Sequence, residues 1–167
     1  KPANLHITLK FLGETEPKRL ERIQPALANA ARSAAPFSMT LAEVGTFGGR
    51  IPRVVWAGVQ EGAERLEALA GAVENGLARA GFPKEKRGFT AHLTLGRVRS
   101  PRNVTPLLAA LRGEPPAPLG TVPVDRFFLM QSELNPSGSI YAELETYVLG
   151  EPEGEGRRKE TRCESPS

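Results

Sequence analysis

The sequence predicts an α+β fold built from two related lobes, and three observations support this class. Short stretches of alternating apolar residues, typical of strands, are separated by longer stretches with apolar residues at helical spacing. A four-residue pattern, His-apolar-Thr-apolar, occurs twice, at residues 6–9 and 92–95. The predicted elements around the second copy partly repeat those around the first, as expected for a duplicated lobe.

The first part of the chain is expected to contain a strand, a helix and a second strand. The first copy of the pattern lies in a predicted strand over 5–12. Pro17 favours a helix start, and apolar residues at helical spacing extend that helix over 17–34. Alternation predicts a strand over 37–44, and the glycine-rich stretch 45–52 is expected to be a loop.

The next part is expected to begin with a strand and a helix and then to carry the second copy of the pattern. β-Branched residues predict a strand over 54–59, and helical spacing predicts a helix over 62–80 that ends at Gly81. The second motif strand is expected over 89–97, followed by a short helix over 103–112.

The C-terminal part is expected to form a β-hairpin followed by a tail. After a proline-rich linker at 113–118, a long strand is predicted over 122–133. Residues 135–138 carry a strong turn signal, and alternation over 140–148 predicts the returning strand. From residue 151 the chain is charged and lacks large apolar residues, which indicates disorder.

The order of these elements indicates an internal repeat with one unit absent. The second half reads strand, helix, motif strand, helix, strand, whereas the first half begins directly at its motif strand. We therefore expect that the N-terminal strand and helix of the first lobe are missing. The domain prediction is a single bilobal domain over 1–150 and a disordered charged tail over 151–167.

Composition excludes several classes of protein. No apolar run approaches the roughly 20 residues that a membrane helix needs, and no signal peptide is visible, so a cytoplasmic location is expected. Cys163 is the only cysteine, which excludes a disulfide framework within one chain. The net charge of +3 is compatible with an anionic substrate such as RNA.

The paired motif carries the functional prediction. Residues two apart on a strand share a face, so His6 points with Thr8 and His92 points with Thr94. With 10 threonines in the chain, both histidines would have this neighbour by chance in roughly 0.4% of such sequences. One neutral and one protonated imidazole suit acid–base chemistry without a metal, and the hydroxyls can donate to phosphate oxygens.

Three more residues near the motifs are candidates for substrate binding. Arg97 could bind phosphate through two hydrogen bonds, or could simply be a solvated strand end. Phe11 could stack on a nucleobase, or could pack in the core. Lys10 shares the predicted face of His6 and could add positive charge there.

Other catalytic arrangements fit the sequence poorly. Two histidines without clustered carboxylates or cysteines are too few ligands for a typical catalytic zinc, so no metal is expected. The Gly-x-Ser-x-Gly pattern of serine hydrolases is absent. Residues 45–50 are rich in glycine but lack the Gly-Lys-Ser/Thr ending of a phosphate loop.

These residues resemble the two-histidine (2H) phosphoesterases, and more narrowly the bacterial and archaeal RNA 2′,3′-cyclic phosphodiesterases, also called 2′-5′ RNA ligases. Ala91 departs from that family, whose members usually carry proline there, and members also begin with a strand and a helix before the first motif. The similarity covers most of residues 1–149, through Asn4–Gly13, Val54–Gly58, Gly81-Phe82, Phe89–Arg97, and the ending with Gln131-Ser-Glu-Leu, Gly138 and Tyr141.

The resemblance implies a fold, a reaction and a set of site residues. The fold would be two similar lobes of antiparallel sheet plus helices, with the active site in the cleft between them. The reaction would open 2′,3′-cyclic phosphates on RNA ends, tRNA fragments included, and leave a 2′-phosphate, with 2′-5′ ligation as its reverse. A monomer without metal or organic cofactor is implied. The site would contain the catalytic pair His6 and His92, the phosphate-binding Thr8, Thr94 and Arg97, and Phe11 facing the base.

Two alternatives stay open from the sequence. The same histidines could act on a different phosphodiester, such as a cyclic nucleotide or an RNA 3′ tail. The chain could also be an RNA-end binding module that has lost catalysis, which replacement of His6 or His92 by alanine would distinguish from an enzyme.

Overall fold

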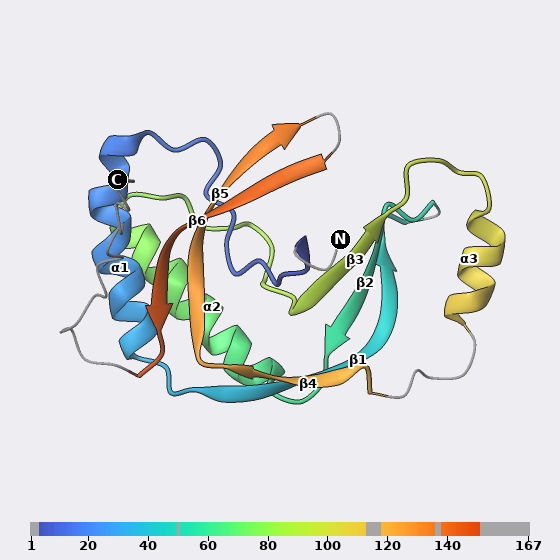
Figure 1. Cartoon of the computed structure of the whole chain (residues 1–167), viewed down its shortest axis with the longest axis horizontal. Coiled ribbons are helices and arrows are strands. Elements are labelled where there is room, and N and C mark those ends of the chain that lie inside the picture. The colour runs from blue at the N-terminus through green and yellow to red at the C-terminus, as the bar shows by residue number, and fades with distance from the viewer. Residues whose placement is uncertain (1–3, 50, 113–117, 136–137, 151–167) are drawn as a thin grey trace, which may run out of the picture.

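The strands of the protein form two separate antiparallel sheets, as the computed structural model in Figure 1 shows. The structure describes residues 4–49, 51–112, 118–135 and 138–150. The four-stranded sheet has the order β3 (His92–Arg97), β2 (Val54–Val59), β1 (Phe37–Phe47), β4 (Gly120–Val124). The second sheet is a hairpin of β5 (Arg126–Asn135) and β6 (Gly138–Val148). The predicted α+β class and the C-terminal hairpin are therefore confirmed.

The helices lie where the apolar spacing predicts them. They are α1 (Leu20–Arg32), which follows the short 3-10 turn η2 (Pro17–Arg19), α2 (Ala63–Arg79) and α3 (Val104–Leu111). Gly81 ends α2 as predicted, with a left-handed φ of 90° that glycine adopts without strain. The amide of Phe82 donates to the carbonyl of Leu77 at 2.9 Å, which closes the last turn in a Schellman motif.

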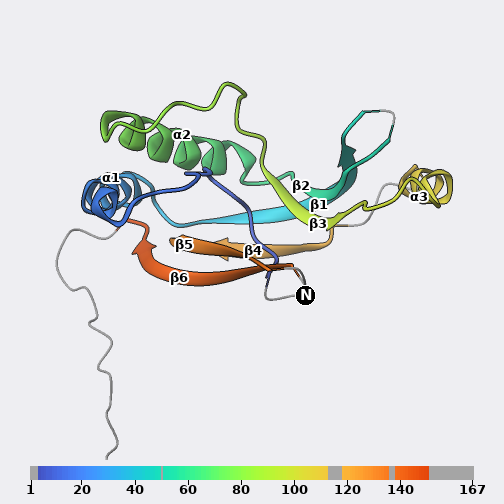
Figure 2. The same ribbon diagram turned by 90° about the horizontal axis from the view of Figure 1, so that it is seen from above.

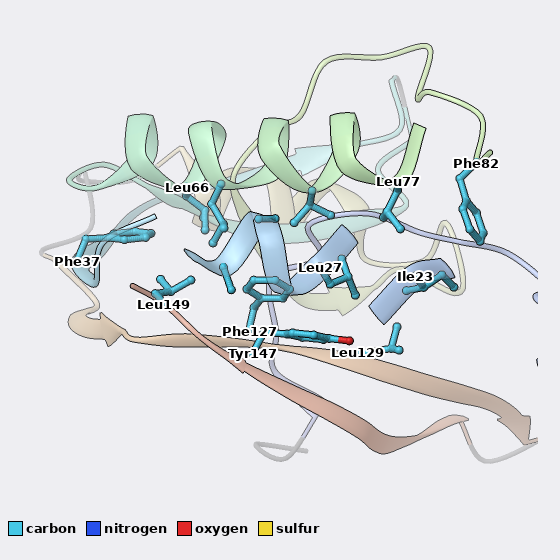
Figure 3. Packing of buried hydrophobic residues seen from close by; sticks show 14 residues of the cluster. Ile23, Leu27, Phe37, Leu66, Leu77, Phe82, Phe127, Leu129, Tyr147 and Leu149 are labelled. Atoms are coloured by element: carbon cyan, nitrogen blue, oxygen red, sulfur yellow. The ribbon is translucent and has the colours of Figure 1, made fainter. Parts of the chain in front are cut away.

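The main core lies where α1 is packed between α2 and the β5–β6 hairpin (Figure 3). Ile23 and Leu77, on α1 and α2, are almost completely buried. The rings of Phe127 and Tyr147 stack from the two hairpin strands with centroids 5.2 Å apart. Figure 2 shows α2 on one side of the four-stranded sheet and the hairpin on the other. Burial of these apolar side chains therefore fixes the two sheets relative to each other.

The predicted first motif strand over 5–12 is wrong. Residues 5–12 have no helical or strand assignment in the structure. Alternating residues favour an extended chain, but a strand also needs a partner that supplies a ladder of hydrogen bonds. Ile7, Leu9 and Leu12 nevertheless pack against the main core. The alternation holds only in part, because Leu5 and Phe11 are exposed.

The predicted long strand over 122–133 is divided at Asp125. Val124 pairs with Phe37 in the four-stranded sheet, whereas Arg126 pairs with Val148 in the hairpin. The carbonyl oxygen of Asp125 between them accepts a hydrogen bond from the amide of Leu149 at 2.8 Å. The chain thus changes sheets within one residue, a property that depends on its partners and leaves no trace in local alternation.

Smaller differences concern the ends of elements. β1 continues to Phe47, so the first part of the predicted 45–52 loop is strand. β3 begins at His92, three residues later than predicted. Residues 113–117 of the predicted linker and the predicted tail over 151–167 lie outside the described residues.

Candidate active site

The second motif lies on β3, at the edge of the four-stranded sheet. His92 pairs with Gly58 of the neighbouring strand, and Thr94 pairs with Trp56. The next residue on β2, Val59, points to the other side of the sheet, where it packs on the main core. His92 and Thr94 therefore share the face of the sheet opposite to that of Val59.

A β-bulge brings Arg97 onto this same face. In a regular strand, a residue five positions after His92 would point to the opposite side. The pairing shifts between Val55 and Trp56, so Leu95 is an extra residue, and Arg97 lies opposite Val54. Val54 and Trp56 share one face of β2, so Arg97 shares the face of Thr94. The structure thus places His92, Thr94 and Arg97 on one face of the sheet, through a bulge that the sequence analysis did not foresee. Their role in binding phosphate stays a prediction.

The first motif lies in the irregular segment that precedes η2. In both Figure 1 and Figure 2 this segment runs between the start of β3 and the β5–β6 hairpin. His6 and Thr8 are exposed, whereas His92 and Thr94 are half-buried. The two motifs therefore lie in different parts of the fold, one on the four-stranded sheet and one in the segment beside the hairpin.

The two histidines share one hydrogen-bonding arrangement. The Nδ1 atom of His6 lies 2.8 Å from the carbonyl oxygen of Asn4, and Nδ1 of His92 lies 2.7 Å from the carbonyl oxygen of Thr90. A carbonyl oxygen only accepts, so Nδ1 carries the proton in both rings. In the neutral ring the lone pair is then on Nε2, which makes that nitrogen the one suited to proton transfer.

Each histidine also contacts one aromatic ring from a distant strand. Tyr141 of β6 lies with its ring centroid 4.8 Å from that of His6, at an interplanar angle of 68°. Phe47 of β1 lies 4.9 Å from His92, at 89°. Both contacts are edge-to-face, a favoured arrangement of aromatic rings. The sequence analysis assigned no role to these rings, although Tyr141 falls in the ending that carries the family resemblance.

A glycine makes room for the aromatic group beside His92. Phe47 lies 5.2 Å from the ring of Trp56, and Gly45 pairs with Trp56 across the sheet. A Cβ atom on Gly45 would lie only 2.3 Å from Cζ2 of that indole. The indole thus lies directly over the glycine backbone, and any larger residue at position 45 would displace it.

The surroundings of Lys10 and Phe11 bear on the roles suggested for them from the sequence. Lys10 does not offer a free positive charge, because its Nζ donates to Glu74 Oε2 at 2.7 Å and its side chain is only 3% exposed. Phe11 is 73% exposed, so it does not pack in the core. Its assignment to a nucleobase stays a prediction.

Two surface hollows are lined by residues of α1, α2 and their neighbours, and neither includes a histidine. Among the described residues, no group of three or more His, Cys, Asp or Glu could hold a metal ion. A cleft between the lobes that contains the motifs therefore stays a prediction.

No helix in the described ranges has the length and apolar character needed to span a bilayer.

Comparisons with known proteins identify the family. The model of the 2′-5′ RNA ligase superfamily matches residues 2–136. A protein of Archaeoglobus fulgidus named RNA 2′,3′-cyclic phosphodiesterase is 40% identical over 148 residues, 88% of this chain and 81% of that protein. A protein of Methanothermobacter thermautotrophicus with the same name is 38% identical over 151 residues, 89% of this chain and 80% of that protein.

Solved structures agree with this assignment. A crystal structure of a Thermus thermophilus protein superposes with a TM-score of 0.73 at 31% identity, covering 90% of this chain and 80% of that one. E. coli LigT in complex with 3′-AMP superposes with a TM-score of 0.70 at 28% identity, with the same coverage. The chain belongs to the 2′-5′ RNA ligase superfamily.

Proposed function

We propose that this protein hydrolyses 2′,3′-cyclic phosphates at RNA ends to 2′-phosphomonoesters, with His6 and His92 as the acid–base pair. The observation that carries this proposal is the matched state of the two imidazoles. Both donate Nδ1–H to a backbone carbonyl and keep Nε2 for proton transfer. The relatives named RNA 2′,3′-cyclic phosphodiesterase support the choice of substrate.

The proposed reaction needs one neutral and one protonated histidine. Nε2 of the neutral ring takes a proton from water as the water oxygen attacks phosphorus in line with the P–O3′ bond. That bond breaks, and the protonated ring gives its Nε2 proton to the leaving 3′ oxygen. Either histidine can take either role in this scheme.

The developing charge on the phosphate falls on its two non-bridging oxygens. Thr8 and Thr94 each carry a hydroxyl two residues after a histidine, and we assign these hydroxyls to the non-bridging oxygens. Arg97 shares the face of His92 and Thr94, and its guanidinium adds charge-assisted hydrogen bonds. Donors that are already in place stabilise the transition state without reorganising during the reaction.

The same groups can also join two RNA ends, with each histidine keeping its role. A 5′-hydroxyl of a second RNA end would replace water as the nucleophile, and attack on the cyclic phosphate would then form a 2′-5′ linkage. Whether hydrolysis or joining dominates depends on whether water or the second end occupies the attacking position. We further propose that the protein acts as a monomer in the cytoplasm, with tRNA fragments among its substrates.

The test is to incubate the full chain, in EDTA, with an RNA oligonucleotide that ends in a 2′,3′-cyclic phosphate. We expect a 2′-phosphate, identified by its resistance to 3′-specific phosphatase and by mass. His6→Ala and His92→Ala are each expected to lower kcat by about 10²–10⁴-fold, the usual contribution of a general acid or base. Lys18→Ala, at an exposed position, is the control.

Other outcomes would redirect the proposal. An untouched cyclic end, together with cleavage of a cyclic nucleotide or of an RNA 3′ tail, would assign the histidines to another phosphodiester. Binding of the oligonucleotide without turnover, unchanged in both histidine variants, would favour a binding module.

A further inference from the structure

The irregular first motif segment raises the question of what holds His6 in place. No strand ladder fixes residues 5–12. Lys10, four residues after His6, anchors this segment through polar contacts. Its Nζ donates to Glu74 Oε2 at 2.7 Å and to the carbonyl oxygen of Pro83 at 2.9 Å. An almost completely buried ammonium group is retained only when it is paired, so this contact determines where the segment can lie.

Glu74 also holds the chain that leads to the second motif. It lies on α2, and its other oxygen, Oε1, accepts a hydrogen bond from the backbone amide of Glu85 at 2.7 Å. Glu85 and Pro83 belong to the irregular stretch between α2 and β3, which ends at His92. One carboxylate on α2 thus binds both the first motif segment and the stretch that leads to the second motif.

Electrostatics agree with this geometry. Partial burial raises the pKa of the Glu74 carboxyl, whereas hydrogen bonds from Lys10 and from the Glu85 amide lower it. Together with the nearby charges of Lys10 and Lys84, they lower the pKa below its usual range. Glu74 is therefore ionised at neutral pH and can serve both donors at once.

A second contact joins the same two parts of the chain. Arg19 of η2 donates to the carbonyl oxygen of Gly81 at 2.9 Å, and its guanidinium lies 4.0 Å from the centroid of the Phe82 ring. The segment after the first motif is therefore tied to the start of the stretch that leads to the second. These contacts place the two motif-bearing segments against the same end of α2.

We infer that Glu74 and Lys10 are positioning residues that set the placement of His6 relative to His92. This inference rests on the proposed function, in which both histidines act on one phosphate. Proton transfer at both sides of a phosphorus atom tolerates little displacement, and an error of about 1 Å can cost about 10²-fold in rate.

The test measures kcat and KM of the full chain for the cyclic-phosphate oligonucleotide in Glu74→Gln, Lys10→Met and the double variant. The glutamine amide keeps one acceptor oxygen but loses the charge and the second acceptor. We expect kcat to fall 10-fold or more in each single variant, with KM changed less than threefold. The double variant should lose little more, because both changes remove the same contact.

Controls separate positioning from loss of folding. Glu67→Gln makes the same chemical change at an exposed position of the same helix, and is expected to keep the kcat of the unchanged protein. Rates are compared at a temperature where circular dichroism shows each variant to be folded. Glu74→Asp keeps the charge but shortens the reach to one of the two segments, and should give an intermediate kcat even if Glu74→Gln does not fold.

The outcomes distinguish this inference from the function on which it rests. A folded Glu74→Gln and Glu74→Asp with kcat within twofold of the unchanged protein, while His6→Ala and His92→Ala are inactive, would overturn the inference and leave the proposed function intact. Full turnover in both histidine variants would overturn the two together.

Discussion

At the scale of single residues, each candidate catalytic histidine is held by a carbonyl on one side and a ring on another. The carbonyl fixes Nδ1 as the protonated nitrogen, and the edge-to-face ring restricts rotation of the imidazole. In both cases the carbonyl belongs to the residue two positions before the histidine, whereas the rings come from different strands, β6 for His6 and β1 for His92. Both arrangements leave Nε2 as the nitrogen suited to proton transfer.

Two histidines in opposite protonation states predict a bell-shaped pH dependence. Activity requires one ring to be neutral and the other charged, so the rate should fall when either state is lost. We expect kcat/KM to fall on both sides of a maximum when rates are measured between about pH 5 and 9. The measurement is a series of initial rates at constant ionic strength, and a flat profile over this range would contradict the scheme.

The position of the Trp56 ring over Gly45 predicts a sharp effect of one methyl group. Gly45→Ala would place Cβ against the indole, so the ring must move and disturb Phe47, which contacts His92. We expect a loss of about 1–3 kcal/mol in the free energy of unfolding, as is usual for overpacking. Denaturant unfolding provides the measurement.

Gly71→Ala is a matched control for this substitution. Gly71 lies within α2, and no atom lies within 4 Å of the position its Cβ would take. Alanine there should stabilise the protein by about 0.5–1 kcal/mol, because it favours the helix. A Gly45→Ala protein as stable as the unchanged one would show that the indole moves freely.

At the scale of elements, the parts that depend on local spacing could be predicted from the sequence. The apolar residues of α1 and α2 recur at helical spacing, and Gly81 supplies the left-handed residue that ends α2. The errors concern pairing between distant segments. Residues 5–12 alternate but have no ladder, and the break at Asp125 reflects a change of partner strand.

The residues of the candidate site divide in the same way, into those that local sequence indicates and those that depend on the packing of distant segments. His6, His92 and their threonines were evident because the motif repeats within the sequence itself. Phe47 and Tyr141 reach the histidines through strand packing, so local sequence gave no reason to choose them. The bulge at Leu95 depends on the register between two strands, and sequence spacing alone would have placed Arg97 on the wrong face.

The bulge in β3 determines the face on which Arg97 lies, so replacing Arg97 tests whether that face binds the phosphate. If the guanidinium binds the phosphate, Arg97→Ala removes a charge-assisted hydrogen bond of about 1.5–3 kcal/mol, which corresponds to a loss of about 10–100-fold in kcat/KM. Arg99→Ala, at an exposed position two residues later, is the control and should change the rate little. Equal effects of the two variants would indicate general attraction of RNA by positive charge rather than a specific contact.

At the scale of the whole molecule, one main core joins α1, α2, the four-stranded sheet and the hairpin. The four-stranded sheet provides His92, and the hairpin provides the ring against His6. The main core between the helices and the hairpin fixes these parts through apolar burial, whereas Lys10 and Glu74 connect the motif segments through charge. The site therefore depends on both the core and one partly buried ion pair.

This dependence predicts how stability changes in acid. The pKa of Glu74 is lowered in the folded state from its ordinary value of 4.5, so the ionised carboxylate stabilises the fold. That contribution is complete above the ordinary value and is lost as pH falls through the lower folded value, because the unfolded chain takes up the proton first. Glu74→Gln removes the titrating group, so its stability should lack this part of the pH dependence.

The measurement compares the free energies of unfolding of the unchanged protein and Glu74→Gln between about pH 7 and 3. The unchanged protein should be the more stable at neutral pH, and the difference should shrink as pH falls below 4.5. Glu67→Gln is the control for the loss of an exposed carboxylate from the same helix. Its free energy of unfolding should differ little from that of the unchanged protein at every pH. A difference for Glu74→Gln that is independent of pH would mean that the carboxylate contributes through its shape and hydrogen bonds alone, and the motif segments would then be held without its charge.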